Sequence, residues 1–188
     1  MRTRNSLLTL TLVVALAATA GAQGPAPVGT PPTGNQYTPV YGVTAGIAIP
    51  FGRAASNNAA GYAVGGLVEY SVYGQPYALR GELLYQHFAL KSGRTGPDLS
   101  DLNVTSLGAT IAYKLLPVTS PASSSTYVTG GIAIYHATRA GTRPGVNGGA
   151  GVEIPLTGFS ATGEARLHLM LSEGRPIITL PLMVGVRF

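Results

Sequence analysis

The sequence lacks cysteine and tryptophan, and only 10% of its 188 residues are charged. Without cysteine the chain has no disulfide framework, no thiolate zinc site, no thioether-linked haem and no acylated-cysteine anchor. Glycine is abundant, at 26 residues, but shows no triplet repeat, which excludes a collagen-like chain. A hydrophobic content of 45% is too high for a disordered protein. It indicates either a membrane environment or an unusually dry core, and the length of 188 residues suits one domain.

The apolar run at residues 7–18 is shorter than the roughly 18 residues that a helical membrane span needs. Arg2 and Arg4 precede this run, and the small residues 20–22 follow it. We therefore predict that residues 1–22 form a cleaved signal peptide for export, with a retained anchor as the alternative. Cleavage would leave 10 basic and 7 acidic residues, a net charge of +3 that does not favour a nucleic-acid partner.

The rest of the chain divides into a short leader and one long patterned region. Residues 23–39 are rich in proline and glycine and predict a flexible leader. Residues 40–188 alternate apolar and small or polar side chains with a period of two, which indicates strands rather than helices. Eight alternating segments are present, at residues 43–51, 62–73, 77–90, 104–116, 127–136, 146–154, 160–171 and 177–188. The sequence predicts an all-β domain in residues 40–188.

Charged residues within the predicted strands decide which face looks inward. They share their face with glycine, alanine, serine and threonine, while the other face is almost purely apolar. Small side chains suit the interior of a narrow tube, and an apolar outer face suits lipid. We predict an eight-stranded antiparallel up-and-down transmembrane β-barrel, with a soluble secreted barrel as the alternative. Its packed lumen would hold a network of four acidic and four basic residues, namely Glu69, Arg80, Glu82, Lys114, Glu153, Glu164, Arg166 and Arg187.

The connections between the segments alternate between long and short, which is typical of outer-membrane barrels, although the fourth is an exception. We expect the charges outside the strands to lie in the outer loops, where basic groups could face the phosphates of lipopolysaccharide or simply be solvated. They are Arg53, Lys91, Arg94, Arg139, Arg143 and Arg175, against Asp98, Asp101 and Glu173.

The segment LMVGVRF at residues 182–188 alternates apolar residues up to a final phenylalanine. With the eight alternating segments, this makes the chain resemble the small eight-stranded outer-membrane β-barrels of the OmpA and OmpX type. The resemblance implies a location in the bacterial outer membrane and a signal for the barrel-assembly machinery formed by Leu182, Val184, Val186 and Phe188. Closure of such a barrel would pair residues 180–188 with residues 43–51. Because tryptophan is absent, aromatic girdles would rest on tyrosines such as Tyr41, Tyr62, Tyr70, Tyr113 and Tyr127.

The residues that could carry chemistry are few and scattered. His87, His136 and His168 fall on three separate segments, so we predict no metal site, no cofactor and no catalytic residue. A lipid-modifying outer-membrane enzyme is disfavoured because no serine or acidic residue stands beside a histidine in the pattern that such chemistry needs. We therefore expect a monomer in contact with outer-membrane lipid, with a structural, envelope-integrity or surface-interaction role. The alternative is a small-solute channel or ligand-binding barrel in which the charged pairs open.

Overall fold

The computed structural model describes residues 38–71, 75–93, 100–115, 124–138, 140–172 and 176–188. The predicted signal peptide at residues 1–22 lies outside these residues, as does almost all of the predicted leader. So do several of the predicted loop charges, namely Arg94, Asp98, Arg139, Glu173 and Arg175. In the described part of the chain no helix is long and apolar enough to cross a membrane.

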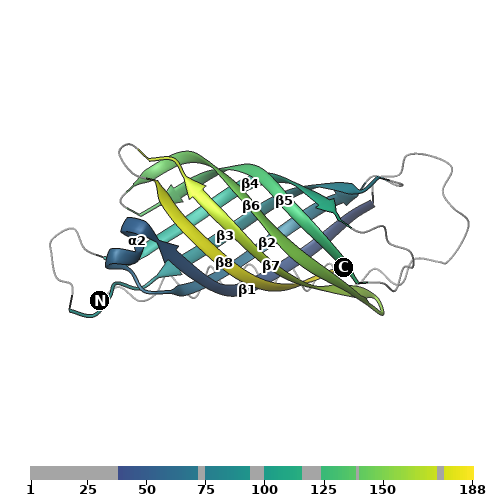
Figure 1. Ribbon diagram of the computed structural model, residues 1–188, viewed down its shortest axis with the longest axis horizontal. Coiled ribbons are helices and arrows are strands. Elements are labelled where there is room, and N and C mark those ends of the chain that lie inside the picture. The colour runs from purple at the N-terminus through teal and green to yellow at the C-terminus, as the bar shows by residue number, and fades with distance from the viewer. Residues whose placement is uncertain (1–37, 72–74, 94–99, 116–123, 139, 173–175) are drawn as a thin grey trace, which may run out of the picture.

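Eight strands close into one barrel in chain order, and every strand is antiparallel to both neighbours (Figure 1). This confirms the predicted fold class. The first and last strands pair from Gly42 with Arg187 to Phe51 with Ile178, which closes the barrel as expected. The strands are β1 (Thr38–Phe51), β2 (Gly61–Ser71), β3 (Tyr77–Phe88), β4 (Leu102–Lys114), β5 (Ser125–Ala137), β6 (Gly141–Leu156), β7 (Phe159–Met170) and β8 (Ile177–Arg187).

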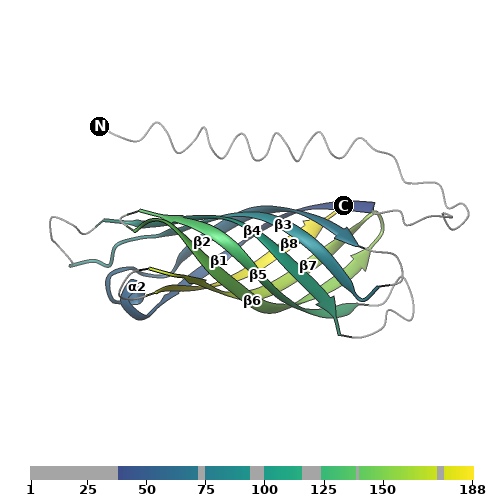
Figure 2. The same cartoon turned by 90° about the horizontal axis from the view of Figure 1, so that it is seen from above.

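A short helix, α2 (Gly52–Asn57), follows β1 and was not predicted. Gly52 turns the chain out of the strand with a φ of 59°, a conformation that favours glycine. Lys91, which follows β3, donates a hydrogen bond of 2.6 Å from Nζ to the carbonyl oxygen of Ala55 in α2. Figures 1 and 2 show α2 and the C-terminus at opposite ends of the barrel, which we call the α2 end and the C-terminal end.

Strand β6 is longer than the sequence predicted, and this corrects the placement of Arg143. Residues 143 and 144 were expected in a long fifth connection, but they lie within β6, and only residues 138–140 join β5 to β6. Pairing with β7 begins at Gly145, so Pro144 lies where β6 has a strand neighbour on the β5 side alone. Proline is tolerated at such an edge because no ladder hydrogen bond needs its missing N–H.

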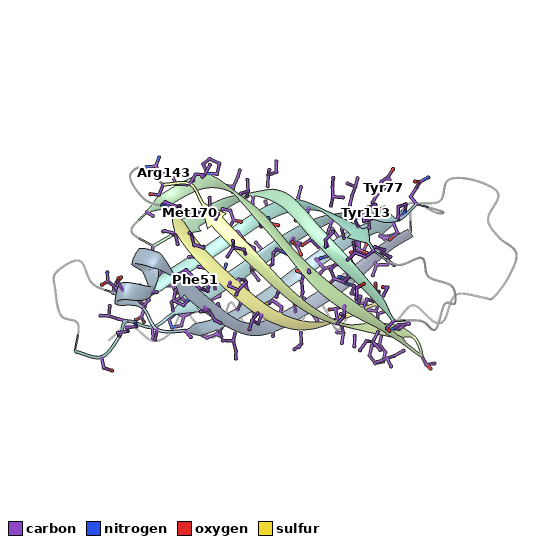
Figure 3. All side chains as sticks on the ribbon, viewed as in Figure 1. Phe51, Tyr77, Tyr113, Arg143 and Met170 are labelled. Atoms are coloured by element: carbon purple, nitrogen blue, oxygen red, sulfur yellow. The ribbon has the colours of Figure 1, made fainter. Side chains whose placement is uncertain are left out.

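The barrel has apolar side chains outside and charged side chains inside, the reverse of a water-soluble barrel. Leu107, Ile132 and Val184 are 65%, 68% and 70% exposed, while Arg80 and Arg166 are buried. Exposed aromatic side chains form a girdle over six of the eight strands at the C-terminal end, where Figure 3 shows Tyr77 and Tyr113. Its exposed members are Tyr41, Tyr70, Tyr77, Tyr113, Phe159 and Phe188.

The expected place of Tyr127 in a girdle was wrong. Tyr127 is only 2% exposed, because it shares the inward face of β5 with Thr129 and Tyr135. The hydroxyl group has hydrogen-bond partners in the lumen, which explains how a tyrosine is tolerated there. Tyr62 does lie on the outer face, but toward the α2 end rather than with the other tyrosines.

Candidate functional site in the barrel lumen

Apolar side chains, which we call the apolar plug, occupy much of the lumen toward the α2 end, together with buried polar residues such as Gln86 and Thr179. Phe88, Tyr135 and Met170 are its largest members and are almost completely buried. The other members are Ala48, Ala63, Leu102, Val104, Ala133, Ala137 and Met183, and Ala54 of α2 packs against them. Figure 3 shows Met170 on the α2 side of the barrel. The plug therefore occupies this end of the lumen with side chains from every strand except β6.

Arg80 lies at the centre of the charged half of the lumen, with a side chain only 1% exposed. Its Nε and Nη2 atoms donate hydrogen bonds of 3.0 and 2.8 Å to Oε2 of Glu69, the residue directly opposite on β2. Its Nη1 atom donates a third bond of 2.8 Å to Oε2 of Glu164 on β7, across the lumen. One guanidinium group thus connects two carboxylates that come from separate strands, in the forked geometry that arginine favours.

Arg166 and Arg187 extend this arrangement to the remaining carboxylates. Arg166 forms ion pairs with Glu82 and Glu164, including a hydrogen bond of 3.0 Å from Nη2 to Oε1 of Glu82. Arg187 on the last strand has Nη1 at 3.4 Å from Glu69 and 3.6 Å from Glu153. The final strand is therefore linked by charge to strands β2 and β6.

Tyr127 contributes to the same arrangement and was missed as a site residue. Its hydroxyl donates a hydrogen bond of 2.9 Å to Glu164 and accepts one of 3.1 Å from Arg187. The guanidinium carbons of Arg80 and Arg187 each lie 5.3 Å from the centre of its ring, a distance suited to cation–π attraction. The only sequence signal for this role was its alternation with Thr129 and Tyr135.

Lys114 completes the set near the C-terminal end, where its Nζ atom lies 3.7 Å from Glu153. Its side chain is 35% exposed, far more than those of the three arginines. Every one of the eight charged residues named from the sequence lies on the inward face and has an ion-pair partner within the set. Together with Tyr127 we call them the ion network.

One small cavity lies within the network. A cavity of about 30 Å³ is lined by residues that include Thr44, Leu84, Glu164 and Pro181. A space of that size has room for about two water molecules. Thr110 continues the polar contacts toward the plug, with its hydroxyl oxygen 3.4 Å from both Glu82 and Asn147.

No protein-family model and no curated protein matches this sequence. Solved structures do match its fold. Neisserial surface protein A aligns with a TM-score of 0.59 and 17% identity over 79% of this chain and 95% of that one. The outer membrane protein OprG from Pseudomonas aeruginosa aligns with a TM-score of 0.51 and 9% identity over 82% and 98%. The fold is that of the small eight-stranded outer-membrane β-barrels.

The eight-stranded outer-membrane barrel fold has an interior only wide enough for side chains or one small ligand. The ion network and the apolar plug take up this interior, which agrees with the small size of the cavity. Because the sequence identities are low, the similarity establishes only the shared fold. What the site can do must be argued from the residues of this chain.

The histidines of this outer-membrane barrel fold do not converge. Nδ1 of His168 lies 3.0 Å from the hydroxyl of Tyr135 in the lumen, whereas the other two histidines face outward. His87 is 2.7 Å from Asn103, and His136 is 2.9 Å from Thr142. Among the described residues, no group of three His, Asp or Glu side chains could hold a metal ion. The hydrogen-bond partners of the three imidazoles are an asparagine, a threonine and a tyrosine.

Proposed function

We propose that this chain is an integral protein of the bacterial outer membrane whose barrel is sealed by its own side chains. Its role is structural, in envelope integrity or in interaction at the cell surface. The observation that carries this proposal is the filled lumen, in which the apolar plug and the ion network leave a cavity of about 30 Å³. The exposed apolar outer face supports a lipid environment, because it would be unfavourable in water.

The same observation disfavours a small-solute channel. A solute would have to separate Arg166 from Glu82 and Glu164, and then pass Phe88, Tyr135 and Met170. Separating a buried ion pair leaves uncompensated charges in a poorly hydrated interior, which is costly. The apolar plug contains no ion pairs that a charged solute could replace. A solute would therefore have to displace the side chains of the plug as well as those of the ion network.

The orientation in the membrane follows from the two ends of the barrel. Because the number of strands is even, the first strand begins and the last strand ends on the same side of the membrane. Outer-membrane barrels have their short turns on the periplasmic side. The connections at residues 72–76 and 157–158 lie at the C-terminal end, and the longer ones at residues 52–60 and 89–101 lie at the α2 end. The long connection at residues 115–124 and the short one at residues 138–140 depart from this pattern. We propose that the C-terminal end faces the periplasm and that α2 faces outward, where lipopolysaccharide would contact the rim. Export would use the predicted signal peptide at residues 1–22.

Two measurements test the proposal. Membrane fractionation with a gel of boiled and unboiled samples should place the mature protein in the membrane fraction with heat-modifiable mobility. A protein found only in the soluble fraction would overturn the location.

Planar-bilayer recording should detect no sustained conductance for the folded wild-type protein or for Arg166→Ala. Leu167→Ala is the matched control, because Leu167 is the next residue on β7 and faces outward. Sustained channels that Arg166→Ala enlarges or abolishes, and that Leu167→Ala leaves unchanged, would contradict the sealed lumen.

A further inference from the structure

The outer face of the barrel has one row of polar side chains near the α2 end. The row crosses four adjacent strands, because His87 pairs with Asn103, Thr105 with His136, and His136 with Thr142. Each member alternates with inward-facing neighbours such as Phe88, Val104 and Tyr135, so its side chain lies on the outside of the barrel. We call His87, Asn103, Thr105, His136 and Thr142 the polar row.

Hydrogen bonds within the row hold its side chains in place. Oδ1 of Asn103 accepts a hydrogen bond of 3.1 Å from the hydroxyl of Tyr85 and lies 2.7 Å from Nδ1 of His87. Because a carbonyl oxygen only accepts, Nδ1 of His87 carries the hydrogen, and Nε2 of the neutral ring is an acceptor. Nδ1 of His136 is similarly engaged, 2.9 Å from the hydroxyl oxygen of Thr142. These bonds do not use the side-chain nitrogen Nδ2 of Asn103 or the Nε2 atoms of the two histidines. Those three atoms are the groups that could contact a ligand.

An exposed aromatic surface lies beside the row. The ring of Tyr62 is 5.2 Å from that of His87 and 6.3 Å from that of Tyr85, measured between ring centres. Tyr62 is 51% exposed. A ligand at the row would therefore meet hydrogen-bonding groups and an aromatic face together.

The row lies at the edge of the apolar band. In β3 ten residue steps separate Tyr77 of the girdle from His87, and in β4 ten steps separate Tyr113 from Asn103. At about 3.3 Å per residue and a strand tilt of about 40°, this distance is about 25 Å along the membrane normal, the usual height of the band. Exposed leucine and isoleucine side chains occupy the outer face next to the row on its membrane side, namely Leu83, Leu107 and Ile134. This side of the barrel therefore matches a molecule with an apolar tail and a polar head.

The outer face of the other strands differs at this edge. Strand β1 ends in the exposed Phe51, and Leu171, just after β7, is exposed as well. The polar row is thus confined to the side formed by β3 to β6, which makes it a local site rather than a continuous belt.

The chemistry of the row favours a sugar over a phosphate. Phosphate groups are bound preferentially by arginine and lysine, through charge-assisted hydrogen bonds. Among the described residues, the row itself offers amide, hydroxyl and imidazole groups, and Asp101 brings a carboxylate to the start of β4 while it accepts a bond from the backbone N–H of Leu90. Arg143 follows Thr142 on β6 but alternates with it, so it belongs to the inward-facing set of that strand. The nearby Lys91 is engaged with Ala55. Neutral donors and acceptors beside an aromatic ring complement the hydroxyl groups and apolar faces of a sugar ring.

We propose that the polar row and Tyr62 bind the sugar headgroup of a glycolipid in the membrane leaflet at the α2 end. The acyl chains of that lipid lie along Leu83, Leu107 and Ile134. This inference rests on the proposed function only in requiring the barrel to span a membrane.

The test uses the full mature chain, folded in nanodiscs that contain equal amounts of monoglucosyldiacylglycerol, phosphatidylglycerol and phosphatidylcholine. Native mass spectrometry of the released barrel should show preferential retention of the glucosyl lipid. Replacing three members of the row, as His87→Leu, Asn103→Leu and His136→Leu together, should lower that retention by about tenfold, the effect of two or three lost hydrogen bonds. Thr126→Leu is the matched control, since Thr126 faces outward on β5 at the other end of the barrel.

The double variant His136→Ala with Thr142→Ala leaves Asn103 intact and should show a smaller loss of glycolipid retention. It tests the same site if the triple variant folds poorly. Heat-modifiable mobility identifies folded protein before each measurement, so a failure to enter the membrane is detected separately and counts against the proposed function. Preferential retention of phosphatidylglycerol would overturn the sugar site, as would equal retention of all three lipids. Unchanged glycolipid retention in the folded variants would overturn it too.

Discussion

Replacing Arg80 by methionine tests whether the ion network holds the barrel together. Methionine keeps much of the side-chain volume but removes three hydrogen bonds, two to Glu69 and one to Glu164. Both carboxylates would then remain in a lumen that holds four acidic groups and only three basic ones. Removing one partner of a buried ion pair costs about 3–5 kcal/mol. We expect a loss of that size in the free energy of unfolding, measured by urea titration in phospholipid vesicles with heat-modifiable mobility as the readout.

Two further variants separate the charge effect from a packing effect. Arg80→Met combined with Glu69→Gln restores equal numbers of acidic and basic groups, and should recover about 1–2 kcal/mol of the loss, since the penalty of an unpaired carboxylate is removed. Lys114→Met is the exposed counterpart, because Lys114 is 35% exposed and lies 3.7 Å from Glu153. It should cost less than about 1 kcal/mol, the usual value of a solvent-exposed pair. The reasoning fails if Arg80→Met is no more harmful than Lys114→Met, or if the double variant is no more stable than the single one.

Two other substitutions test the closing strand and the close approach of strands. Phe188→Ala should strongly reduce the amount of folded protein that reaches the membrane. The free energy of unfolding of the protein that does fold should fall by only about 1 kcal/mol, because the side chain is partly exposed. Unchanged membrane levels would contradict an assembly signal. Gly131→Ala should destabilise the barrel by about 1–3 kcal/mol, because its Cβ would overlap the backbone oxygen of Ala109 on β4. The neighbouring Gly130→Ala meets no atom within 4 Å and should change stability by less than about 0.5 kcal/mol, so equal effects in urea titrations would refute the steric explanation.

The two-residue period of hydrophobicity predicted most of the fold from the sequence alone. It identified eight strands and their two faces because a barrel with a packed interior fixes which alternate residue points inward. The ends of strands were less predictable. Strand β6 extends beyond its expected start at residue 146 to include Arg143 and Pro144, because a turn with Gly141 at a φ of 69° lets it keep pairing with β5.

The membership of the ion network was readable from the sequence, but its pairing was not. Glu69 and Arg80 are direct neighbours on adjacent strands, and the pairs Arg80–Glu82 and Glu164–Arg166 lie two residues apart on one strand, so these contacts follow from local position. The contact between Glu82 and Arg166 crosses the lumen from β3 to β7 and depends on how the strands are staggered around the barrel. Tyr127 was misplaced because tyrosine suits both a membrane interface and a buried hydrogen bond.

The ion network also bears on how the last strand finds its register. Buried ion pairs add little stability compared with apolar packing, so their effect is better sought in what they exclude. A shift of β8 by one residue would turn Arg187 away from Glu69 and Tyr127 and into lipid. An arginine facing the middle of the bilayer costs about 2–4 kcal/mol, and less near the interface where Arg187 lies. Because Glu69 and Glu153 would lose this partner at the same time, the correct closure is favoured on both faces of the strand.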